Sequence, residues 1–472
     1  MSFASLTFIF VFLPAALILF YIVPRGNWRS LVLVLSSLVF FAWVDLAHLH
    51  FLILSVIFTY GFGLLIGSLG SNENQHLRQA VLWTGVGANL LFLAYFKYLG
   101  FFGEILSAFV QGRIRFEEQA LLLGISYLTF SSLSYLIDVH KKIKPAERNF
   151  LKIATYLILF PKLVQGPIAL YKDMESQLSQ SRFDLEDFHW GIRRFIIGLG
   201  KKVLLADSLA IAANRVFSVN YARIGADVAW VGLIAYTLMI YFDFSGYTDM
   251  ALGIGRMFGF RLPENFNYPY ISRSITDFWR RWHMSLTNWF RTYVFIPLEF
   301  KRRRVKFLRQ QTNILLVFFL TGLWHGASWN YVIWGIYFGL VLALEASGWG
   351  RALKKLPIFL QHTYALVIVM IGWVFFKITD LNQWLRFLGA LLGINGFTGT
   401  QTLRSLNILF YLPILIIGIV LSTPLLEKIG KIKWLKPTTG RVILDFVCLG
   451  IFILSLSFVL SNGFQSFMYA QF

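Results

Sequence analysis

Cysteine is nearly absent from this sequence, and its scarcity removes several classes of site. Only Cys448 occurs among 472 residues, which excludes a disulfide framework, a cysteine-based zinc site and an iron–sulfur cluster. Charged residues are also scarce, at 14% against about 25% in soluble domains. Hydrophobic residues reach 57%. A water-soluble enzyme and a disordered chain are both excluded, because so much apolar surface requires burial or lipid.

Several common catalytic motifs are missing as well. The sequence contains no Gly-x-Ser-x-Gly elbow, no Gly-x4-Gly-Lys-Ser/Thr phosphate loop and no His-Glu-x-x-His zinc helix. None of its eight histidines begins a His-x4-Asp acyltransferase motif. We therefore expect no metal site and no permanently bound cofactor. The chemistry that remains is a histidine acting as a base on a hydroxyl at membrane depth.

Positive charge greatly exceeds negative charge, with 43 Lys and Arg against 23 Asp and Glu and a net charge of +20. In a soluble protein this excess would suggest nucleic acid as the partner. Here the basic residues cluster in short loops between apolar runs, which is the positive-inside pattern of membrane proteins. The predicted partner is therefore the lipid bilayer and not nucleic acid. Residues 141–148 and 301–309 are expected on the cytoplasmic side.

Long apolar runs without Asp, Glu, Lys or Arg dominate the chain. They are 1–24, 30–44, 51–72, 79–96, 119–137, 228–242, 310–344, 363–376, 405–426 and 446–472. A spanning helix needs about 20 apolar residues, so we expect about ten to twelve transmembrane helices with shorter helices between them. The run 310–344 is long enough for two helices with a break near 326–330. No internal repeat occurs, so the prediction is one integral-membrane domain over residues 1–472.

Polar residues interrupt the apolar pattern most densely at 241–267, which reads YFDFSGYTDMALGIGRMFGFRLPENFN. Such residues are costly at membrane depth and mark candidate functional sites. Asp243 and Tyr247 are four residues apart and share a helix face. The alternative is a structural polar network that joins helices, with ion pairs such as Asp249 to a nearby arginine.

The segment 277–298, DFWRRWHMSLTNWFRTYVFIPL, is predicted as one amphipathic helix. At 100° per residue its bulky apolar side chains fall in one arc, and its arginines and Asn288 lie opposite, where they can reach water or phosphate. His283 falls inside the aromatic arc. A core histidine with satisfied hydrogen bonds is the alternative explanation.

His325 lies in a third segment, 321–334, which reads TGLWHGASWNYVIW. It is the only histidine in the 35-residue stretch 310–344, which contains no Asp, Glu, Lys or Arg. Gly322 and Gly326 form a small-xxx-small pair, so another helix or a substrate can approach closely. We expect room beside them for a narrow acyl chain. A neutral imidazole in such a setting can accept a proton, although a structural histidine remains an alternative.

These segments resemble the membrane-bound O-acyltransferase family. The resemblance is closest to its bacterial branch, the membrane subunits of alginate O-acetylation and the teichoic-acid D-alanine transfer proteins. The matching pieces are LGISYLTFSSLSYLIDV (123–139), FPKLVQGPI (160–168), GLGKKVLLAD (198–207), YFDFSGYTDMALGIGRMFGFRLPENFNYPY (241–270), FWRRWHMSLTNWFR (278–291) and GLWHGASWN (322–330). WRRWH followed about forty residues later by LWHG is the most specific combination.

The resemblance implies an all-α polytopic fold, with a ring of transmembrane helices and short re-entrant or interfacial helices around a central funnel or tunnel. Residues 120–345 carry the motifs, and residues 360–472 match only as hydrophobic helices. His325 matches the family's near-invariant catalytic histidine, and His283 matches the second histidine of this branch. The resemblance also implies a partner, either an extracytoplasmic SGNH-type acetyltransferase or a small membrane acyl-acceptor protein.

Together these observations predict an O-acyltransferase of the bacterial plasma membrane. It would pass an acyl group, most simply acetyl, from a cytoplasmic thioester donor to a cell-envelope polysaccharide. The donor would be acetyl-CoA or an acyl-phosphopantetheine carrier protein. His325 would be the general base, and His283 would orient the acyl carbonyl or share the proton. Further candidates for the substrate and donor channel are Trp279, Arg280, Arg281, Trp282, Trp324, Trp329, Asn330, Asp243, Ser245, Tyr247, Asp249, Asn265 and Asn267.

Three alternatives stay open at this point. The first is D-alanyl transfer to teichoic acid from a carrier protein. The second is a secondary transporter with Asp243 and Asp249 on an ion path, although transporters commonly contain internal repeats. The third is a scaffold that only anchors an extracellular enzyme.

Overall fold

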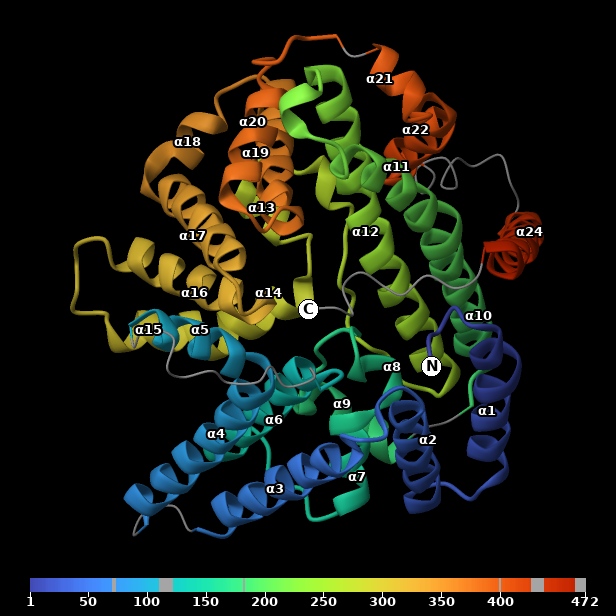
Figure 1. Ribbon diagram of the computed structural model, residues 1–472. Coiled ribbons are helices and arrows are strands. Elements are labelled where there is room, and N and C mark those ends of the chain that lie inside the picture. The colour runs from blue at the N-terminus through green and yellow to red at the C-terminus, as the bar shows by residue number, and fades with distance from the viewer. Residues whose placement is uncertain (70–73, 110–121, 181–182, 399, 426–436, 463–472) are drawn as a thin grey trace. The chain divides into compact units, whose positions relative to one another are not determined.

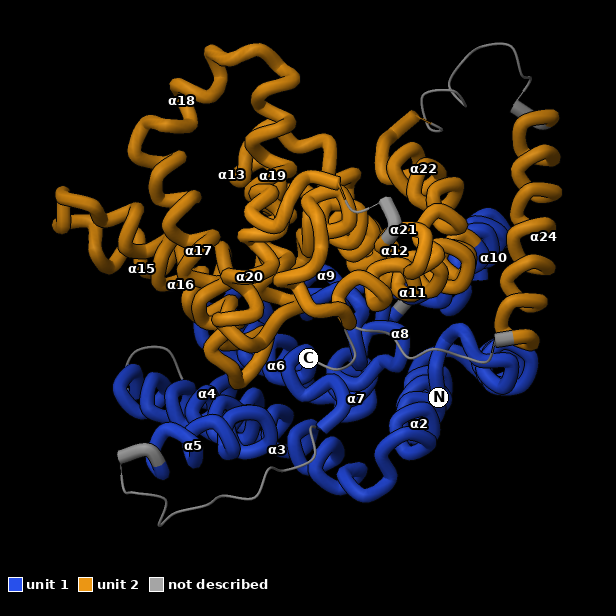
Figure 2. Tube along the Cα trace, turned by 45° about the horizontal axis from the view of Figure 1, so that its top comes forward, with its two compact units in different colours: residues 1–196, 247–264 blue, residues 197–246, 265–472 orange. Residues whose placement is uncertain are grey.

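The structure is a computed structural model, and it describes residues 1–69, 74–109, 122–180, 183–398, 400–425 and 437–462. Every regular element among these residues is a helix. The charge-free runs 51–72, 119–137, 405–426 and 446–472 extend into residues outside the described part. The chain divides into two compact units, residues 1–196 with 247–264 and residues 197–246 with 265–472 (Figure 2).

Unit 1 is built from the N-terminal helices (Figure 1). They are η1 (Phe8–Phe12), α1 (Leu13–Ile22), α2 (Asn27–Asp45), α3 (Leu49–Ser68), α4 (Gln75–Lys97), α5 (Leu99–Phe109), α6 (Ile125–His140), α7 (Phe150–Ile158), α8 (Phe160–Leu163) and α9 (Tyr171–Gln180). Two long helices, α10 (Leu185–Gly200) and α12 (Ala226–Met257), contribute residues to both units.

Unit 2 contains the remaining elements. They are η2 (Lys201–Ala206), α11 (Asp207–Phe217), η3 (Tyr221–Arg223), η4 (Pro269–Ile271), α13 (Ile275–Trp279), α14 (Met284–Phe290), η5 (Arg291–Phe295), α15 (Ile296–Lys301), α16 (Arg309–His325), α17 (Trp329–Leu344), η6 (Glu345–Trp349), α18 (Gly350–Leu353), α19 (Ile358–Lys377), α20 (Leu381–Leu391), α21 (Thr400–Ser405), η7 (Ile408–Tyr411), α22 (Leu412–Leu421) and α24 (Pro437–Asn462).

Seven helices among the described residues are long and apolar enough to cross a membrane. They are Asn27–Asp45, Leu49–Ser68, Gln75–Lys97, Ala226–Met257, Trp329–Leu353, Ile358–Lys377 and Thr439–Ser461. Two shorter apolar helices cover Phe8–Ile22 and Ile408–Leu421. The predicted class, an all-α polytopic membrane protein, is confirmed. The count of ten to twelve spans remains a prediction, because several apolar runs form helices shorter than a bilayer crossing.

The break expected near 326–330 is present. Helix α16 ends at His325, Gly326 is extended, and α17 starts at Trp329. Helices α16 and α17 pack closely, since a Cβ on Gly322 would lie 2.4 Å from the backbone oxygen of Tyr331. The expectation of open space for an acyl chain beside these glycines is wrong. A Cβ on Gly326 would meet the Tyr331 ring at 2.3 Å, so a neighbouring side chain fills that space.

The single helix predicted over 277–298 is also wrong. The structure has α13, then a break at 280–283, then α14, the π-helical turn η5 and α15. His283 adopts the left-handed conformation, with φ 46° and ψ 51°, which a non-glycine residue rarely does. The predicted separation of an aromatic face from a polar face is nevertheless present, because the aromatic arc is buried while Arg280, Asn288 and Arg291 are exposed.

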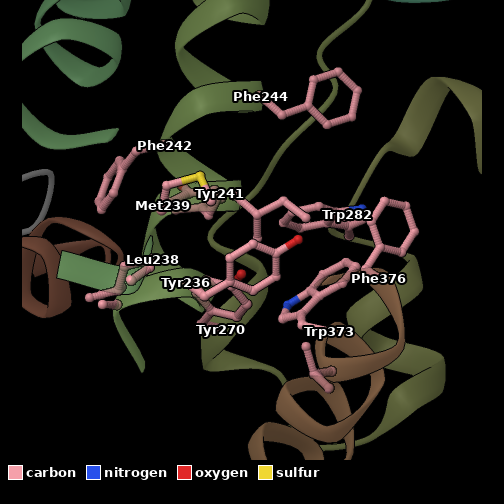
Figure 3. Close-up of a cluster of buried hydrophobic side chains, with 14 of the residues drawn as sticks. Tyr236, Leu238, Met239, Tyr241, Phe242, Phe244, Tyr270, Trp282, Trp373 and Phe376 are labelled. Atoms are coloured by element: carbon pink, nitrogen blue, oxygen red, sulfur yellow. The ribbon is translucent and has the colours of Figure 1, made fainter. Parts of the chain in front are cut away.

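Aromatic side chains form much of the core of unit 2 (Figure 3). Trp282 packs against Trp373 with ring centroids 4.9 Å apart and stacks on Phe278 at 5.6 Å. The hydroxyl of Tyr270 donates to the carbonyl of Thr237 on α12 at 2.6 Å. Such contacts contribute about 0.5–1.5 kcal/mol each beyond area burial. They anchor the segment that carries His283 to α12 and α19.

Candidate active site

His325 is the last residue of α16 and is only 3% exposed. Its imidazole lies among aromatic rings, with centroid distances of 4.6 Å to Trp324, 4.8 Å to Trp334 and 4.9 Å to Phe376. These rings come from α16, α17 and α19. Three helices of unit 2 therefore enclose this histidine and exclude water from it.

His283 lies against the same indole as His325. Its ring is 5.8 Å from that of Trp324 and 4.8 Å from that of Phe244, and the residue is 1% exposed. Since both imidazoles contact Trp324, the structure brings together two histidines that are 42 positions apart in the chain. With centroid distances of 5.8 and 4.6 Å to that shared indole, both rings can face one ligand site.

Asn265 determines which nitrogen of His283 carries the proton. Its Oδ1 accepts hydrogen bonds from the backbone N–H of Ser285 at 3.1 Å and from the Ser285 hydroxyl at 2.9 Å, and it lies 3.1 Å from His283 Nδ1. A backbone N–H can only donate, so this atom of Asn265 must be the amide oxygen. An oxygen acceptor requires a hydrogen on Nδ1, which leaves the lone pair on Nε2.

The Nε2 atom of His283 is buried and has no hydrogen-bond partner among the described residues. Burial lowers the pKa of His283 to about 3, because a charged imidazolium would lose its hydration. The ring is therefore neutral at physiological pH and presents an unshared lone pair. The Nε2 lone pair can therefore accept a hydrogen bond from a bound hydroxyl.

A cavity of about 1050 Å³ lies in unit 2, and its lining includes Leu286 and Thr321, which are three and four positions from the two histidines in the chain. Its basic lining residues are Arg273, Arg280, Arg291, Arg351 and Lys354, and its acidic ones are Asp277 and Glu345. Apolar side chains such as Leu286 and Phe318 line it as well. The cavity therefore combines a cationic rim with an apolar wall.

Trp279 stands between the cavity and His325. It lines the cavity, and its ring is 5.2 Å from Phe318 and 5.6 Å from Trp334, which itself contacts His325. The cavity reaches Thr321, one helical turn before His325, but His325 does not line it. Among the residues that the structure describes, the indoles of Trp279 and Trp334 therefore lie in sequence between this cavity and the His325 ring.

Glu345 is a site residue that sequence reasoning missed. Its carboxylate accepts hydrogen bonds from the backbone N–H groups of Ile275 and Thr276 at 2.8 and 2.9 Å. The hydroxyls of Thr276 and Tyr364 donate to it at 2.6 and 3.1 Å. A carboxylate at a helix N-terminus satisfies otherwise unpaired N–H groups. Glu345 thereby fixes the start of α13, the helix that carries Trp279. Its one sequence signal is an acid directly after the charge-free run 310–344.

The other tryptophan and asparagine candidates divide into core and surface positions. Trp282 belongs to the buried aromatic core of unit 2. Asn330 is buried and donates from Nδ2 to the carbonyl of Phe375 at 3.0 Å. Trp329 is 61% exposed and does not wall a buried site. Asn267 is exposed, and its backbone N–H and carbonyl bond to Arg281.

The polar candidates on α12 are largely engaged in other contacts. Asp243 pairs with buried Lys202 at 2.8 Å, and Lys202 also pairs with Asp207 at 2.7 Å. Ser245 is buried in the same unit. In unit 1, Asp249 pairs with Arg194 at 2.7 Å, which is the kind of ion pair that the structural alternative predicts. Tyr247, also in unit 1, stacks on Phe3 with centroids 4.8 Å apart.

No group of three or more His, Cys, Asp or Glu side chains within the described ranges could hold a metal ion. The groups that converge on the site are instead two imidazoles, the Asn265 amide and the basic residues of the cavity rim.

Comparisons with known proteins identify a family and several relatives. The family model described as MBOAT, membrane-bound O-acyltransferase family, matches residues 49–381. A probable alginate O-acetylase of Azotobacter vinelandii is 40% identical, over 86% of this chain and 80% of its own length. A peptidoglycan O-acetyltransferase of Helicobacter pylori is 31% identical, over 97% and 96%. A teichoic acid D-alanyltransferase of Bacillus subtilis is 31% identical, over 54% and 67%.

Proposed function

The chain belongs to the membrane-bound O-acyltransferase family, and from this premise we propose that it passes acetyl groups from a cytoplasmic thioester to hydroxyls of a cell-envelope polysaccharide. It is a multi-pass membrane O-acyltransferase. Acetyl is the proposed group because relatives aligned over most of the chain carry acetylase and acetyltransferase names. The observation that carries the proposal is the buried His283–Trp324–His325 arrangement with its fixed neutral tautomer.

The donor is proposed to enter through the cavity of unit 2. Its volume of about 1050 Å³ lies just above the range of ordinary ligand pockets, which span about 300–1000 Å³. The arginines of its rim suit the phosphates of acetyl-CoA or of a phosphopantetheine arm. The thioester would then pass Phe318 toward Trp279. Rotation of the Trp279 indole would open a path from the cavity toward the histidines.

The proposed reaction is one acyl transfer with balanced bonds. The acceptor hydroxyl attacks the thioester carbonyl, a carbon–oxygen bond forms, and the carbon–sulfur bond breaks. An imidazole takes the hydroxyl proton and returns it to the departing thiolate, so no other reactant is needed. His325 is the proposed base, and His283 shares the proton through its Nε2 lone pair. The aromatic side chains around both rings exclude water, which would otherwise hydrolyse the thioester.

Substitution of each histidine tests this function. His325→Ala and His283→Ala should each lower acetyl transfer by about 10²–10⁴-fold, the usual contribution of a positioned base. His50→Ala is the matched control, because His50 is exposed at the start of α3. Membrane insertion and expression should stay unchanged in all three variants. Near-wild-type transfer by both catalytic variants would refute the assignment.

The membrane is proposed to be the bacterial plasma membrane, with the loop 301–309 in the cytoplasm. Six basic residues in this loop provide the positive-inside signal. A cysteine placed at exposed Arg304, in a chain with Cys448→Ser, should resist impermeant thiol reagents in intact cells. Rapid labelling from outside would reverse both the orientation and the donor side.

A second candidate is D-alanyl transfer from an acidic carrier protein. The loop 301–309 favours it, because Phe307 at 81% and other exposed side chains stand beside its basic residues. The purified protein in liposomes separates the two functions. Transfer with acetyl-CoA alone supports acetylation, whereas a strict requirement for a charged carrier supports the alternative.

For polysaccharide acetylation the proposed partner is an extracytoplasmic SGNH-type acetyltransferase or a small membrane acceptor protein.

A further inference from the structure

A second basic cavity, of about 650 Å³, lies in unit 1. Its lining residues come from the C-terminal end of α3, the first turn of α4, the C-terminal end of α6 and the segment that follows α6. The described residues that line it include four cations and no carboxylate. The four cations are Arg78, Lys142, Lys144 and Arg148.

The helix ends hold one of these cations in place. Arg78 is 9% exposed, and its Nε and Nη2 donate to the carbonyls of Ile66 and Val139 at 3.2 and 2.9 Å. A guanidinium has five N–H donors, so Arg78 retains donors for a ligand in the cavity that it lines. Its position is set by the fold, whereas a surface side chain would have to be ordered when a ligand binds.

The other three cations come from the segment after α6. Lys144 pairs with Glu175. The side chains of Lys142 and Arg148 form no ion pair with any residue that the structure describes. Arg78, Lys142 and Arg148 line one cavity that has no carboxylate among its described lining residues. Their charges repel one another, and a bound anion relieves that repulsion.

The apolar part of the cavity indicates a lipid rather than a soluble anion. Leu64, Leu69 and Val139 line it beside the cations. Ile57 lies seven residues before Leu64 on the same face of α3 and is 48% exposed. Apolar surface therefore continues from the cavity along a candidate membrane span, as an acyl chain attached to a headgroup requires.

We propose that this cavity binds the phosphate headgroup of an anionic phospholipid from the cytoplasmic leaflet. Arg78, Lys142 and Arg148 contact the phosphate, and the acyl chain follows the Leu64–Ile57 face of α3. Basic pockets between transmembrane helices on the cytoplasmic side are suited to such headgroups. The site shares no residue with the histidine site, and it does not depend on the acyl-transfer reaction.

Lipid binding to the full-length protein in detergent tests the proposal. Phosphatidylglycerol and phosphatidylcholine are titrated, and bound lipid is counted by native mass spectrometry. The wild type should bind phosphatidylglycerol in preference. The Lys142→Gln/Arg148→Gln variant should bind it roughly 30-fold more weakly, since each cation near an anionic lipid contributes about fivefold in affinity. The matched control is Arg304→Gln/Lys306→Gln, which removes the same charge from exposed positions of the loop 301–309.

Thermal unfolding with and without phosphatidylglycerol checks that the variant is folded. The cavity variant should melt like the wild type without lipid and lose the stabilisation that the lipid gives. Excess inorganic phosphate should not displace the lipid from the wild type. Equal phosphatidylglycerol binding by the cavity variant and the control variant would overturn the proposal. Full displacement by inorganic phosphate would overturn the lipid as ligand in favour of a soluble anion.

Discussion

Replacement of Asn265 by alanine is the sharpest test of the proposed proton acceptor. The change removes one amide oxygen that serves the Ser285 backbone N–H, the Ser285 hydroxyl and His283 Nδ1–H. The hydroxyl can rotate to another acceptor, but the backbone N–H remains buried and unpaired. Nδ1–H also loses its acceptor, unless the ring changes tautomer and moves its lone pair away from Nε2.

The magnitude follows from these hydrogen bonds. Each buried donor left without an acceptor costs about 1–3 kcal/mol, so Asn265→Ala should lower the free energy of unfolding by about 2–6 kcal/mol. Acetyl transfer should fall by about 10²–10⁴-fold, because the lone pair is no longer held on Nε2. Thermal unfolding and transfer from acetyl-CoA measure the two effects. Asn382→Ala, at an exposed position of α20, is the control. Full activity of Asn265→Ala at a temperature where it is folded would refute the tautomer argument.

The pH dependence of activity tests whether His283 accepts a proton. In the wild type burial lowers the pKa of His283 from the ordinary imidazole value of 6.5 to about 3, so the ring becomes protonated only as the pH falls toward 3. Activity should therefore show no acid limb from His283 near pH 6.5. Asn265→Asp places a carboxylate beside Nδ1, which favours imidazolium and raises the pKa. Its acid limb should move to higher pH, and an unchanged profile would count against a proton-accepting His283.

Three further changes test the surroundings of the site. Glu345→Gln places an amide N–H₂ against a backbone N–H of Ile275 or Thr276. It should lower the free energy of unfolding by about 1–3 kcal/mol, measured by thermal unfolding. The control Glu186→Gln, at an exposed acid, should leave the melting temperature unchanged. Trp279→Ala should open the cavity toward His325 and increase thioester hydrolysis without acceptor, measured as free thiol released; an unchanged hydrolysis rate would show that the indole is not the barrier. Gly322→Leu should prevent α16 from packing on α17 and abolish insertion of folded protein, judged by gel filtration in detergent; a normally folded variant would contradict this packing.

Features encoded locally were predictable from the sequence. The helix break at 326–330 follows from a Gly-Ala-Ser segment inside an apolar run, and the structure has it at those positions. The burial of the aromatic arc around His283 was predictable for the same reason, because a periodic apolar face needs a core. The positions of bulky apolar residues therefore predicted the fold class, and they marked both histidines as polar exceptions within apolar segments.

Features that depend on distant partners were not predictable. The segment 277–298 has a helical pattern, but Asn265 binds His283 and Ser285 from about twenty residues away. These bonds accompany a left-handed residue where the pattern predicts a continuous helix. Glu345 caps α13 from 70 positions along the chain. Neither contact leaves a periodic signal, so each becomes visible only in three dimensions.

The buried polar residues are distinguished by what they bond to rather than by their chemistry. The sequence marks Asp243, Asp249 and His283 alike, as costly groups at membrane depth. Asp243 and Asp249 each bond to a cation, and that pairing offsets their desolvation. His283 instead has one nitrogen committed to Asn265 and the other without a partner among the described residues. A proton acceptor needs an unshared lone pair, so this asymmetry favours acyl transfer at the histidines over an ion path along α12.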